Sequence, residues 1–384
     1  MLRPKLVRIT TIPASLNSLL KNQLKYMNQY YEVHAVSSPG ERLEEVKKRE
    51  GVFTHAIYMT RTLSPFQDLK SLFQLIKLIR KERPLIVHTH TPKAGTLGML
   101  AAKICGIPVR MHTVAGLPLL ETKGLKRTLL NTVEKITYRC ATGIYPNSFK
   151  LKEIIVQNGL CKESKLKVIG NGSSNGIDSN YFDPANISET TKQELKEKIG
   201  LKDADITFCF IGRIVKDKGI KELIKAFAIN AEKYKNIKLV LVGSAERAID
   251  PLDKETEQII TSHPQIYAAG VQADVRPFLA VSDIFVFPSY REGFPNVVLQ
   301  AGAMGIPSIV SNINGCNEII ENNVNGIIVP VKDVHSLTDA MRYLIDNKDA
   351  RHRIASACRN IIVSHYSQAY IWEQILEEYK NQSA

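Results

Sequence analysis

The chain has 384 residues, of which 44% are apolar, a length that exceeds one ordinary core and predicts two domains. It has no apolar stretch of the roughly 18 residues that suggest a membrane span, and its start lacks the apolar run and cleavage site of a signal peptide. Its six scattered cysteines contain no C-x-x-C pair, which favours reduced thiols of a cytoplasmic protein over a disulfide framework or a zinc site.

The positive charge is concentrated in the first half of the chain. Residues 1–182 carry 28 Lys and Arg against 12 Asp and Glu, a net charge of +16, whereas residues 183–384 carry 23 against 26, a net charge of −3. A membrane surface, or a lipid carrying a pyrophosphate, fits this asymmetry as an anionic partner. We expect no nucleic acid partner, because the sequence has no recognition motif or aromatic-interleaved basic stretch. The alternative is a generically basic solvated surface.

The first half alternates apolar strands with amphipathic helices, which predicts a doubly wound parallel sheet. Strands are expected at Lys5–Thr10, Glu32–Ser37, Ala56–Met59, Leu85–Thr89, Val109–Thr113 and Gly143–Tyr145. Helices are expected at Leu16–Tyr30, Pro65–Lys81, Lys93–Cys105, Lys126–Arg139 and Phe149–Asn158. The second of these helices has a clear predicted start, with Ser64 as N-cap, Pro65 at the first helical position and Gln67 completing a capping box.

A segment rich in Gly, Asn and Ser, from residue 167 to residue 183, predicts a hinge between two domains. The pattern then starts afresh with a helix and four strands, which indicates a second Rossmann-like domain. These elements are expected at Thr191–Ile199, Ile206–Ile211, Leu239–Val242, Ile284–Phe287 and Ser308–Ser311. The predicted domains are therefore residues 1–182 and residues 183–364.

The most informative segment runs from Asp283 to Glu318 and has the strand–loop–helix–strand pattern of a parallel sheet. Such sheets bind ligands beyond the carboxyl ends of their strands. Glu292 follows the strand there, beside Gly293 and a helix start preset by Pro295. A carboxylate beside free backbone N–H groups suits a ligand that carries both a sugar and a phosphate. The alternative is an exposed loop carboxylate.

A second cluster of polar residues follows the strand at 206–211. Gly212 lets the chain turn, Arg213 offers a planar fork for phosphate oxygens, and Lys218 adds a point charge near a helix start. The alternative is a pair of solvated charges in a βα loop.

Three histidines stand at strand ends of the first domain. His112, followed by Gly116, has room for a ligand beside it, although a lone strand histidine is often a core residue. His88 and His90 are expected at the end of the preceding strand, where they would contact an acceptor substrate. A His-x-His pair is also a metal pattern, but carboxylate or cysteine partners are not apparent nearby in the sequence.

The block PSYREGFPNVVLQAGAMGIPSIVSNINGCNEII resembles the motif of glycosyltransferase family 4, the retaining nucleotide-sugar transferases. The resemblance implies the GT-B fold, in which two Rossmann-like doubly wound domains face a central cleft. It implies that Glu292 lies by the donor sugar and that Gln300, where the family has a second glutamate, binds the nucleotide ribose. It also implies that Arg213 and Lys218 bind the donor diphosphate without a metal, and that His112 contacts the sugar across the cleft. The implied donor-binding residues are Gly212, Arg213, Lys218, Gly293, Phe294, Pro295, Asn296, Val297 and Gln300.

One departure from the family lies at residues 11–15, where Thr-Ile-Pro-Ala-Ser replaces a Gly-Gly pair. This loop resembles the branch that builds capsule, lipopolysaccharide and lipid-linked oligosaccharides. Within that branch the basic helix at 126–139 is interpreted as a surface lying on the membrane, the alternative being an ordinary core-packing helix. The resemblance also implies that the last helix, about 365–384, packs back on the first domain.

We therefore predict a retaining, metal-independent glycosyltransferase that needs no cofactor beyond its donor. It would move a hexose or N-acetylhexosamine from a UDP-sugar to a lipid-linked (polyprenyl-diphosphate) or surface-polysaccharide glycan, at the inner face of the cell membrane. Two alternatives share the expected fold. One is a non-hydrolysing UDP-sugar 2-epimerase, and the other is a non-catalytic protein that binds a nucleotide sugar.

Overall fold

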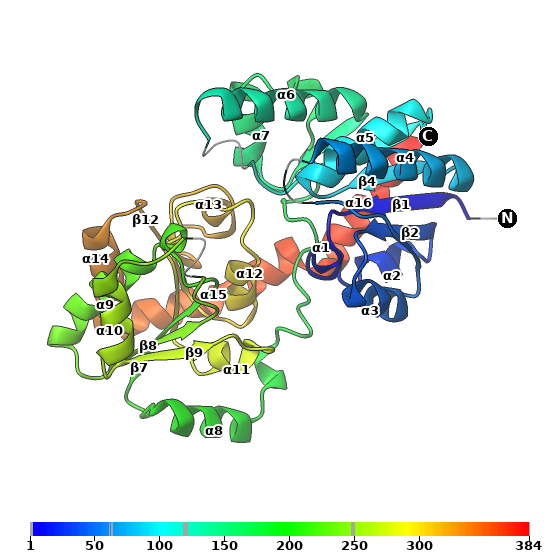
Figure 1. Cartoon of the computed structure of the whole chain (residues 1–384). Helices are drawn as coiled ribbons and strands as arrows, with labels where there is room; N and C mark the ends of the chain where they lie inside the picture. Colours follow the sequence, from blue (N-terminus) through cyan, green and yellow to red (C-terminus); the bar gives the residue numbers. More distant parts are fainter. Residues whose placement is uncertain (1–2, 61, 63, 118–121, 247–249, 384) are drawn as a thin grey trace. The chain divides into compact units, whose positions relative to one another are not determined.

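The chain folds into two compact units, each built on one parallel sheet (Figure 1). The computed structural model describes residues 3–60, 62, 64–117, 122–246 and 250–383. The first unit is Met1–Gly176 with Gln368–Ala384, and the second is Ile177–Ser367. Each unit is described below by itself.

The sheet of the first unit has six parallel strands in the order β3-β2-β1-β4-β5-β6. Apart from the edge strand β3, whose Phe53 and Ala56 are exposed, the apolar residues of these strands are buried, as expected of a parallel sheet covered on both faces. The strands are β1 (Lys5–Ile9), β2 (Glu32–Ser37), β3 (Phe53–Ala56), β4 (Ile86–Thr89), β5 (Val109–Val114) and β6 (Gly143–Pro146).

Two layers of helices cover this sheet. One layer packs over a core that includes Val7, Ile9 and Val87, and it consists of α4 (Pro65–Glu82), α5 (Pro92–Ile104), α6 (Gly124–Cys140) and α7 (Phe149–Gln157). The other packs over a core that includes Leu6 and Val33, and it consists of α1 (Pro13–Leu19), α2 (Gln23–Met27), α3 (Glu41–Glu50) and α16 (Gln368–Ser383). A short 3-10 helix, η2 (Glu163–Lys165), follows α7.

The sheet of the second unit also has six parallel strands, in the order β12-β11-β10-β7-β8-β9. They are β7 (Ile206–Ile211), β8 (Ile237–Val242), β9 (Ile266–Gly270), β10 (Ile284–Phe287), β11 (Ser308–Ser311) and β12 (Gly326–Val329). Helices pack on both faces over one continuous core. They are α8 (Glu189–Ile199), α9 (Ile220–Lys233), α10 (Lys254–Ser262), α11 (Arg276–Ala280), α12 (Asn296–Ala303), α13 (Cys316–Ile319), α14 (Val334–Asp346) and α15 (Lys348–Tyr366), with η3 (Pro184–Asn186) and η4 (Lys216–Lys218).

The C-terminal helix α16 belongs to the first unit. The Tyr379 hydroxyl lies 2.7 Å from His88 Nδ1, and the Tyr145 hydroxyl donates to Glu378 at 2.9 Å. The indole of Trp372, the only tryptophan, donates to Asn175 at 2.8 Å. Buried polar bonds of this kind fix the helix in one position, because each would leave an unpaired buried group if the helix moved.

The division between the units falls earlier than the predicted boundary after residue 182. It lies between Gly176 and Ile177, because Ile177 pairs with Ser367 and its N–H donates to the Tyr366 carbonyl at 2.7 Å. Phe182 is buried in the core of the second unit. Residues 177–182 therefore fold with the second unit.

Several predicted elements differ from the structure. The expected helix at 16–30 is two helices, α1 and α2, separated at Asn22, whose φ of 64° is left-handed. The expected strand at 56–59 lies at 53–56, since β3 pairs with β2 from Phe53 to Ala56. The capping box at Ser64 is wrong because Ser64 makes no side-chain cap and the Gln67 amide donates to the Tyr58 carbonyl at 3.2 Å. The strands β9 and β12 were not predicted.

Candidate active site

Four neighbouring strands of the second sheet bring the predicted site residues to one edge. In the sheet order, β11, β10, β7 and β8 are consecutive. The loops that follow them carry Asn314, Glu292, Arg213 and Glu246. Because all strands are parallel, these loops meet at the carboxyl edge, where open α/β sheets bind ligands.

Lys218 and Glu292, predicted for different parts of a donor, form an ion pair. Lys218 Nζ contacts Glu292 Oε1, and the two side chains are only 14% and 17% exposed. The Ser289 hydroxyl lies 3.0 Å from the same carboxylate oxygen, and Lys218 Nζ lies 5.7 Å from the centre of the Phe287 ring. The pair is thus held at the end of β10 and shielded from water, which strengthens charge–charge interactions.

A glycine brings the two halves of this pair together. Gly219 has φ of +68°, and a Cβ added to it would lie 2.1 Å from the Pro288 carbonyl oxygen. The Tyr290 N–H also donates to the Asp217 carbonyl at 2.9 Å. The turn after β7 therefore packs backbone to backbone against the loop after β10, which only glycine permits at residue 219.

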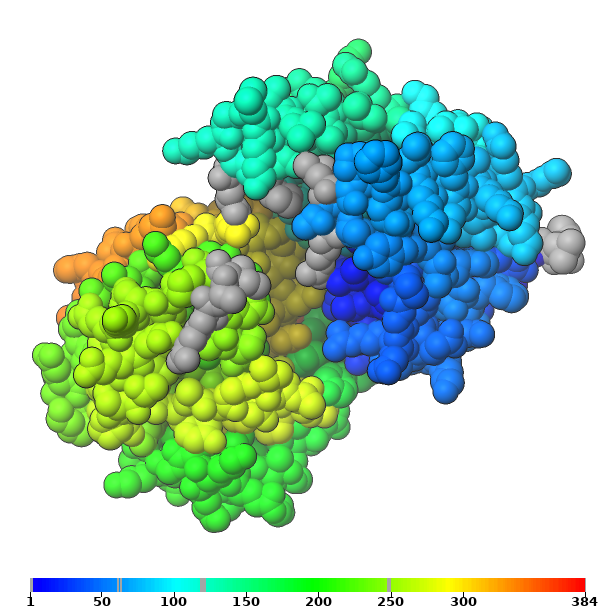
Figure 2. Space-filling model, in the orientation of Figure 1, coloured from blue at the N-terminus to red at the C-terminus, as the bar shows by residue number. Residues whose placement is uncertain are grey.

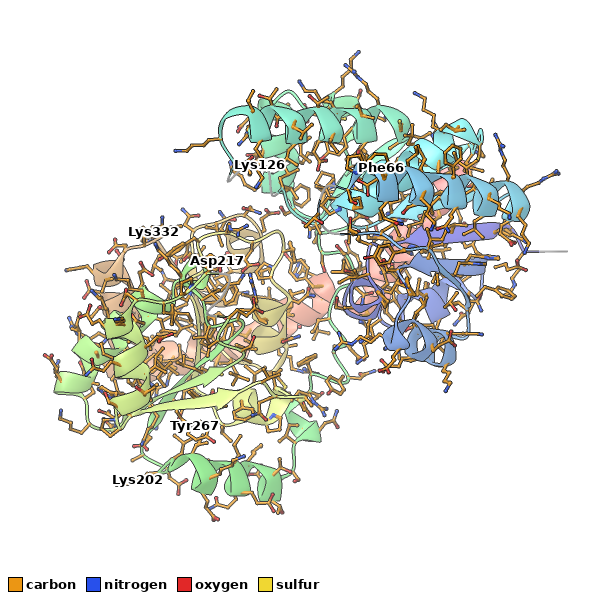
Figure 3. All side chains as sticks on the ribbon, in the orientation of Figure 1. Phe66, Lys126, Lys202, Asp217, Tyr267 and Lys332 are labelled. Atoms are coloured by element: carbon orange, nitrogen blue, oxygen red, sulfur yellow. The ribbon has the colours of Figure 1, made fainter. Side chains whose placement is uncertain are left out.

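Arg213 lies among carboxylates at the same edge. Its Nη1 is 3.2 Å from Glu246 Oε2 and its Nη2 is 3.7 Å from Asp217 Oδ2, with the side chain 42% exposed. Arg291 Nη2 lies 3.1 Å from Asp217 Oδ2 as well, and Figure 3 labels Asp217 at this edge. The planar fork of Arg213 is therefore solvent-accessible but shared between two acids.

The loop between Glu292 and α12 is fixed by residues that follow β11. The Asn314 amide donates to the carbonyl oxygens of Glu292 and Gly293. A Cβ on Gly315, whose φ is +77°, would lie 2.7 Å from the Gly293 carbonyl oxygen. Asn314 and Ser289 were not predicted as site residues, although both stand in the motif at strand ends. They position the backbone that carries Glu292.

The predicted residues after Glu292 separate into buried and accessible ones. Phe294 is buried, with its ring centre 5.5 Å from that of Tyr366, so its side chain packs in the core. Pro295 occupies the N-cap of α12 with φ of −79°, one position before the expected first helical residue. Asn296 is exposed at the helix start, whereas Val297 packs partly against the core.

Gln300 lies half-buried in α12, one turn after Asn296. Its side-chain amide has no hydrogen-bond partner among the residues that the structure describes. Gly212, at the end of β7, donates its N–H to the Val242 carbonyl at 2.9 Å. Gln300 is therefore available for a ligand, whereas the Gly212 N–H is already bonded.

His112 lies in the first domain and is buried. Its Nδ1 is 2.7 Å from the Thr89 hydroxyl, and its ring packs so closely on α5 that a Cβ at Gly95 would lie 2.4 Å from it. Burial lowers the pKa of His112 to about 4, so the ring is neutral at pH 7. The predicted contact of His112 with a donor sugar stays a prediction.

His88 and His90 are parts of the core beneath α16. His88 places Nδ1 2.7 Å from the Tyr379 hydroxyl and Nε2 2.7 Å from the Thr113 hydroxyl. His90 Nε2 accepts a hydrogen bond of 2.9 Å from Nε of Arg8, which is completely buried. The expectation that His88 touches an acceptor is wrong, because both ring nitrogens already have protein partners.

One group of residues in the described part of the chain has ligand atoms close enough for a metal ion. It consists of Glu32, His34 and Glu82. Lys5 Nζ lies 2.7 Å from Glu82 and 3.2 Å from Glu32. The ammonium group already supplies the positive charge between these carboxylates, so the group fits a charge-compensated ion pair better than a metal site.

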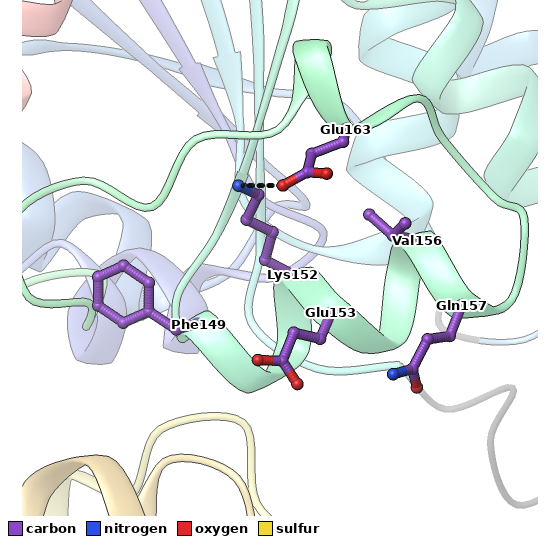
Figure 4. Close-up of a pocket in the computed structure, with 6 residues that line it drawn as sticks. All are labelled: Phe149, Lys152, Glu153, Val156, Gln157 and Glu163. Atoms are coloured by element: carbon purple, nitrogen blue, oxygen red, sulfur yellow. Dashed lines mark ion pairs between the residues drawn. The ribbon is translucent and has the colours of Figure 1, made fainter.

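A cavity of about 300 Å³ lies beside α7 in the first domain (Figure 4). Lys152 and Glu163, which both line it, form an ion pair with 3.0 Å between Nζ and Oε1. Lys150 pairs with Glu153, which also lines the cavity, at 2.6 Å. Because its charged groups are paired with each other, the cavity adds no group to the candidate site.

Two family models match the chain, one for each domain. Residues 24–172 match the glycosyl transferase 4-like domain, and residues 191–361 match the glycosyl transferases group 1. The chain is 36% identical to the capsular polysaccharide biosynthesis glycosyltransferase CapM of Staphylococcus aureus, covering 98% of this chain and 96% of that protein. It is 33% identical to the UDP-Gal:alpha-D-GlcNAc-diphosphoundecaprenol alpha-1,3-galactosyltransferase of Escherichia coli, covering 80% of this chain and 78% of that protein.

A solved structure shows the same fold across the whole chain. HepE from Anabaena in complex with UDP superposes with a TM-score of 0.82 at 18% identity, covering 99% of this chain and all of that one. Two Rossmann-like domains of this kind constitute the GT-B fold of glycosyltransferases. The chain belongs to the glycosyltransferase family that the two models describe.

Proposed function

We propose that this glycosyltransferase moves a hexose or N-acetylhexosamine, with retention of configuration, from a UDP-sugar to a lipid-linked or surface-polysaccharide glycan. The observation that carries the proposal is the shielded Lys218–Glu292 pair, with Arg213 at the same sheet edge. UDP as the donor nucleotide is supported by the name of the Escherichia coli relative, which also names a diphosphoundecaprenol-linked acceptor, and by the UDP complex of HepE.

In this proposal the donor diphosphate replaces two carboxylates as the ionic partner of Lys218 and Arg213. Without a ligand, Lys218 neutralises Glu292 and Arg213 faces Glu246. A diphosphate carries more negative charge than either carboxylate and offers oxygens to both cations, so it competes for them. Glu292, released from Lys218, then accepts hydrogen bonds from hydroxyl groups of the donor sugar.

The nucleotide would lie along the start of α12. Gln300 offers both a carbonyl acceptor and an amide donor, which suits ribose hydroxyls. The backbone from Gly293 to Val297 reaches the N-terminus of α12, where the helix dipole favours the negative charge of a phosphate. We propose that these groups hold the ribose and diphosphate while Glu292 holds the sugar.

Arg213 and Lys218 would stabilise the negative charge that develops on the departing UDP. Charge stabilisation aimed at the leaving group is the largest single contribution to many enzymatic rates. Two fixed cations perform the task that a divalent metal performs in other transferases, so we propose a metal-independent reaction. The departing phosphate would take the proton of the acceptor hydroxyl, which attacks from the same face.

We propose that the acceptor is carried by a lipid and that the protein works at the inner face of the cell membrane, through its basic first domain. The net charge of +16 over residues 1–182 supports this location. No helix in the described ranges is both long and apolar enough to cross a membrane. We propose a peripheral contact, made by basic side chains at the membrane surface.

The test is release of UDP from a panel of UDP-sugars, with and without a polyprenyl-diphosphate-linked sugar acceptor. We expect acceptor-dependent release from one donor. Glu292→Gln should reduce kcat at least a hundredfold while the fold is retained, because the amide cannot accept as two carboxylate oxygens do. Glu194→Gln, at an exposed position of α8, is the matched control and should retain full activity.

The outcomes separate the alternatives. UDP-sugar conversion without an acceptor indicates an epimerase. UDP binding without turnover of any donor and acceptor indicates a non-catalytic nucleotide-sugar-binding protein. Equal activity of Glu292→Gln and Glu194→Gln contradicts the assignment of Glu292. A requirement for a divalent cation, shown by loss of activity with a chelator and its recovery with added metal, contradicts the metal-independent mechanism.

A further inference from the structure

The outer face of α4 exposes large apolar side chains to solvent. Phe66 is 93% exposed, Leu69 53% and Phe73 64%. Their spacing of three and four residues puts them on one face of the helix, opposite Leu75 and Ile79, which enter the core. Core packing therefore does not explain them, and an exposed apolar patch of this kind marks an interaction surface.

The same face of α4 is basic. Four exposed cations share it with the apolar residues and continue it toward the C-terminal end of the helix: Lys70, Lys77, Arg80 and Lys81. The acidic residues of α4 face its neighbours, with Asp68 bonded to Lys93 and Glu82 to Lys5. Glu82 Oε1 also lies 3.8 Å from Lys81 Nζ, so the outer face combines its apolar side chains with three cations that neither carboxylate of α4 pairs with: Lys70, Lys77 and Arg80.

The helix α6 repeats this combination. Leu125 is 90% exposed, Leu129 47% and Ile136 41%, and spacings of four and seven put them on one face. Lys126, labelled in Figure 3, and Arg139 are exposed beside them. The predicted alternative, an ordinary core-packing helix, does not account for this outer face.

The two helices belong to one layer and point the same way. Both α4 and α6 pack against α5, which lies between them on the sheet, and Figure 2 shows their residues at the molecular surface. Each helix follows a parallel strand, so its first turn lies at the carboxyl edge of the sheet. The most exposed apolar residues, Phe66 and Leu125, stand in those first turns. The apolar part of the surface thus lies at the edge where such sheets bind ligands.

A basic cavity adjoins the C-terminal end of α6. It has a volume of about 540 Å³ and no acidic residue in its lining. Its cations come from α6 and from the segment after α7: Lys135, Arg139, Lys162 and Lys165. The Tyr138 side chain lines the cavity and is buried, and its hydroxyl interacts with the Glu134 carboxylate. The positive charge of this cavity suits a phosphate-bearing headgroup.

We propose that the outer faces of α4 and α6, which we call the α4–α6 surface, dock the protein on an anionic lipid bilayer. Exposed aromatic and aliphatic side chains enter the boundary of the acyl chains, while the cations contact lipid phosphates. A second copy of the chain fits this surface poorly, because two such faces would bring like charges together. The inference rests on the proposed function, since an enzyme with a lipid-linked acceptor works at a bilayer.

The test is binding of the full chain to vesicles, measured by co-sedimentation without donor or acceptor. We expect binding to vesicles of phosphatidylcholine with phosphatidylglycerol and none to phosphatidylcholine alone. The triple variant Lys70→Gln/Lys77→Gln/Arg80→Gln should bind about a hundredfold more weakly, from the average contribution of basic residues near an anionic surface. The variant Phe66→Ser/Phe73→Ser/Leu125→Ser should bind at least tenfold more weakly at unchanged charge.

The matched control removes three exposed cations from α3, in the layer on the opposite face of the sheet. Arg42→Gln/Lys47→Gln/Lys48→Gln changes the net charge equally and should retain binding within threefold. If this control loses as much vesicle binding as the α4–α6 variant, binding depends on net positive charge alone and the α4–α6 surface is overturned. If the protein is a dimer in solution and the apolar variant is a monomer, the surface binds a second copy of the chain and the proposed contact with a bilayer is overturned.

Activity on a water-soluble, short-chain acceptor separates this inference from the proposed function. The α4–α6 variants should transfer sugar to that acceptor at the rate of the unmodified protein. Vesicle binding that depends on the α4–α6 surface, in a protein that transfers no sugar, contradicts the proposed function and leaves the docking surface supported. Transfer without any vesicle binding contradicts the docking surface alone.

Discussion

Replacement of Gly219 by alanine tests whether the close approach of two loops builds the candidate site. At φ of +68° an added Cβ meets the Pro288 carbonyl oxygen at 2.1 Å, more than 1 Å inside ordinary contact. The left-handed backbone costs about 1–2 kcal/mol for a residue with a Cβ. Forcing the loops apart adds about 1–3 kcal/mol, the range for overpacked sites. We expect the variant to lose about 2–5 kcal/mol of unfolding free energy.

Gly200→Ala is the matched control in the same domain. Its φ is +67° and a Cβ there meets nothing within 4 Å, so it carries the backbone cost alone, about 1–2 kcal/mol. Effects on the unfolded chain cancel between the two variants, since each replaces glycine by alanine. The difference in unfolding free energy, measured by urea titration with circular dichroism, should therefore be about 1–3 kcal/mol.

The same displacement should reach the site, because Pro288 leads directly into Ser289 and the loop that carries Glu292. UDP affinity, measured by isothermal titration calorimetry, should fall at least tenfold in Gly219→Ala and remain unchanged in Gly200→Ala. Equal stability of the two variants, together with equal UDP affinity, refutes the argument that this backbone contact positions Glu292 against Lys218.

Three further predictions concern single side chains. The pKa of His112 is about 4 in the folded protein, below the value near 6.5 in the unfolded chain. As the pH falls, this histidine is therefore protonated first in the unfolded chain. The free energy of unfolding should decrease as the pH drops from about 6.5 towards 4. The variant His112→Asn should reduce that slope in urea unfolding by about 1.4 kcal/mol per pH unit, whereas His335→Gln, 88% exposed at its side chain, should not. Tyr379→Phe removes the hydroxyl that bonds His88 and should lower the unfolding free energy by about 1–3 kcal/mol, whereas Tyr343→Phe should have almost no effect; equal losses contradict the buried bond. Gln300→Ala should weaken UDP binding in calorimetry about tenfold, and Gln300→Glu should retain it; unchanged affinity in Gln300→Ala contradicts the ribose contact.

The fold was predictable because parallel sheets leave strong periodic signals. The strands at Glu32–Ser37, Ile206–Ile211, Ile284–Phe287 and Ser308–Ser311 lie where the sequence predicts them, since each is an apolar run bounded by turn residues. The strand β9 is partly exposed, and three of its five residues are alanine or glycine, which are depleted in strands and give a weak signal. The break between α1 and α2 depends on a left-handed Asn22, which helical periodicity does not reveal.

The candidate site was predictable in its residue types but not in its connections. The motif identified Glu292, Arg213 and Lys218, yet it did not show that Lys218 and Glu292 pair. Sequence separation hides this contact, because the two residues are 74 positions apart in the chain. The buried bonds of His88 were equally hidden, since one partner stands 291 residues away on the C-terminal helix.

The amino-acid sequence by itself determined two parallel α/β domains, a basic first half and the residue types of the candidate site. Periodicity, charge and local motifs are properties of neighbouring residues, so they are visible in the chain. Only the tertiary structure decided which charges neutralise each other, which histidines are buried and which helix faces remain exposed. Those properties depend on strand order and on packing between distant segments, where burial and distance set the energy of each contact.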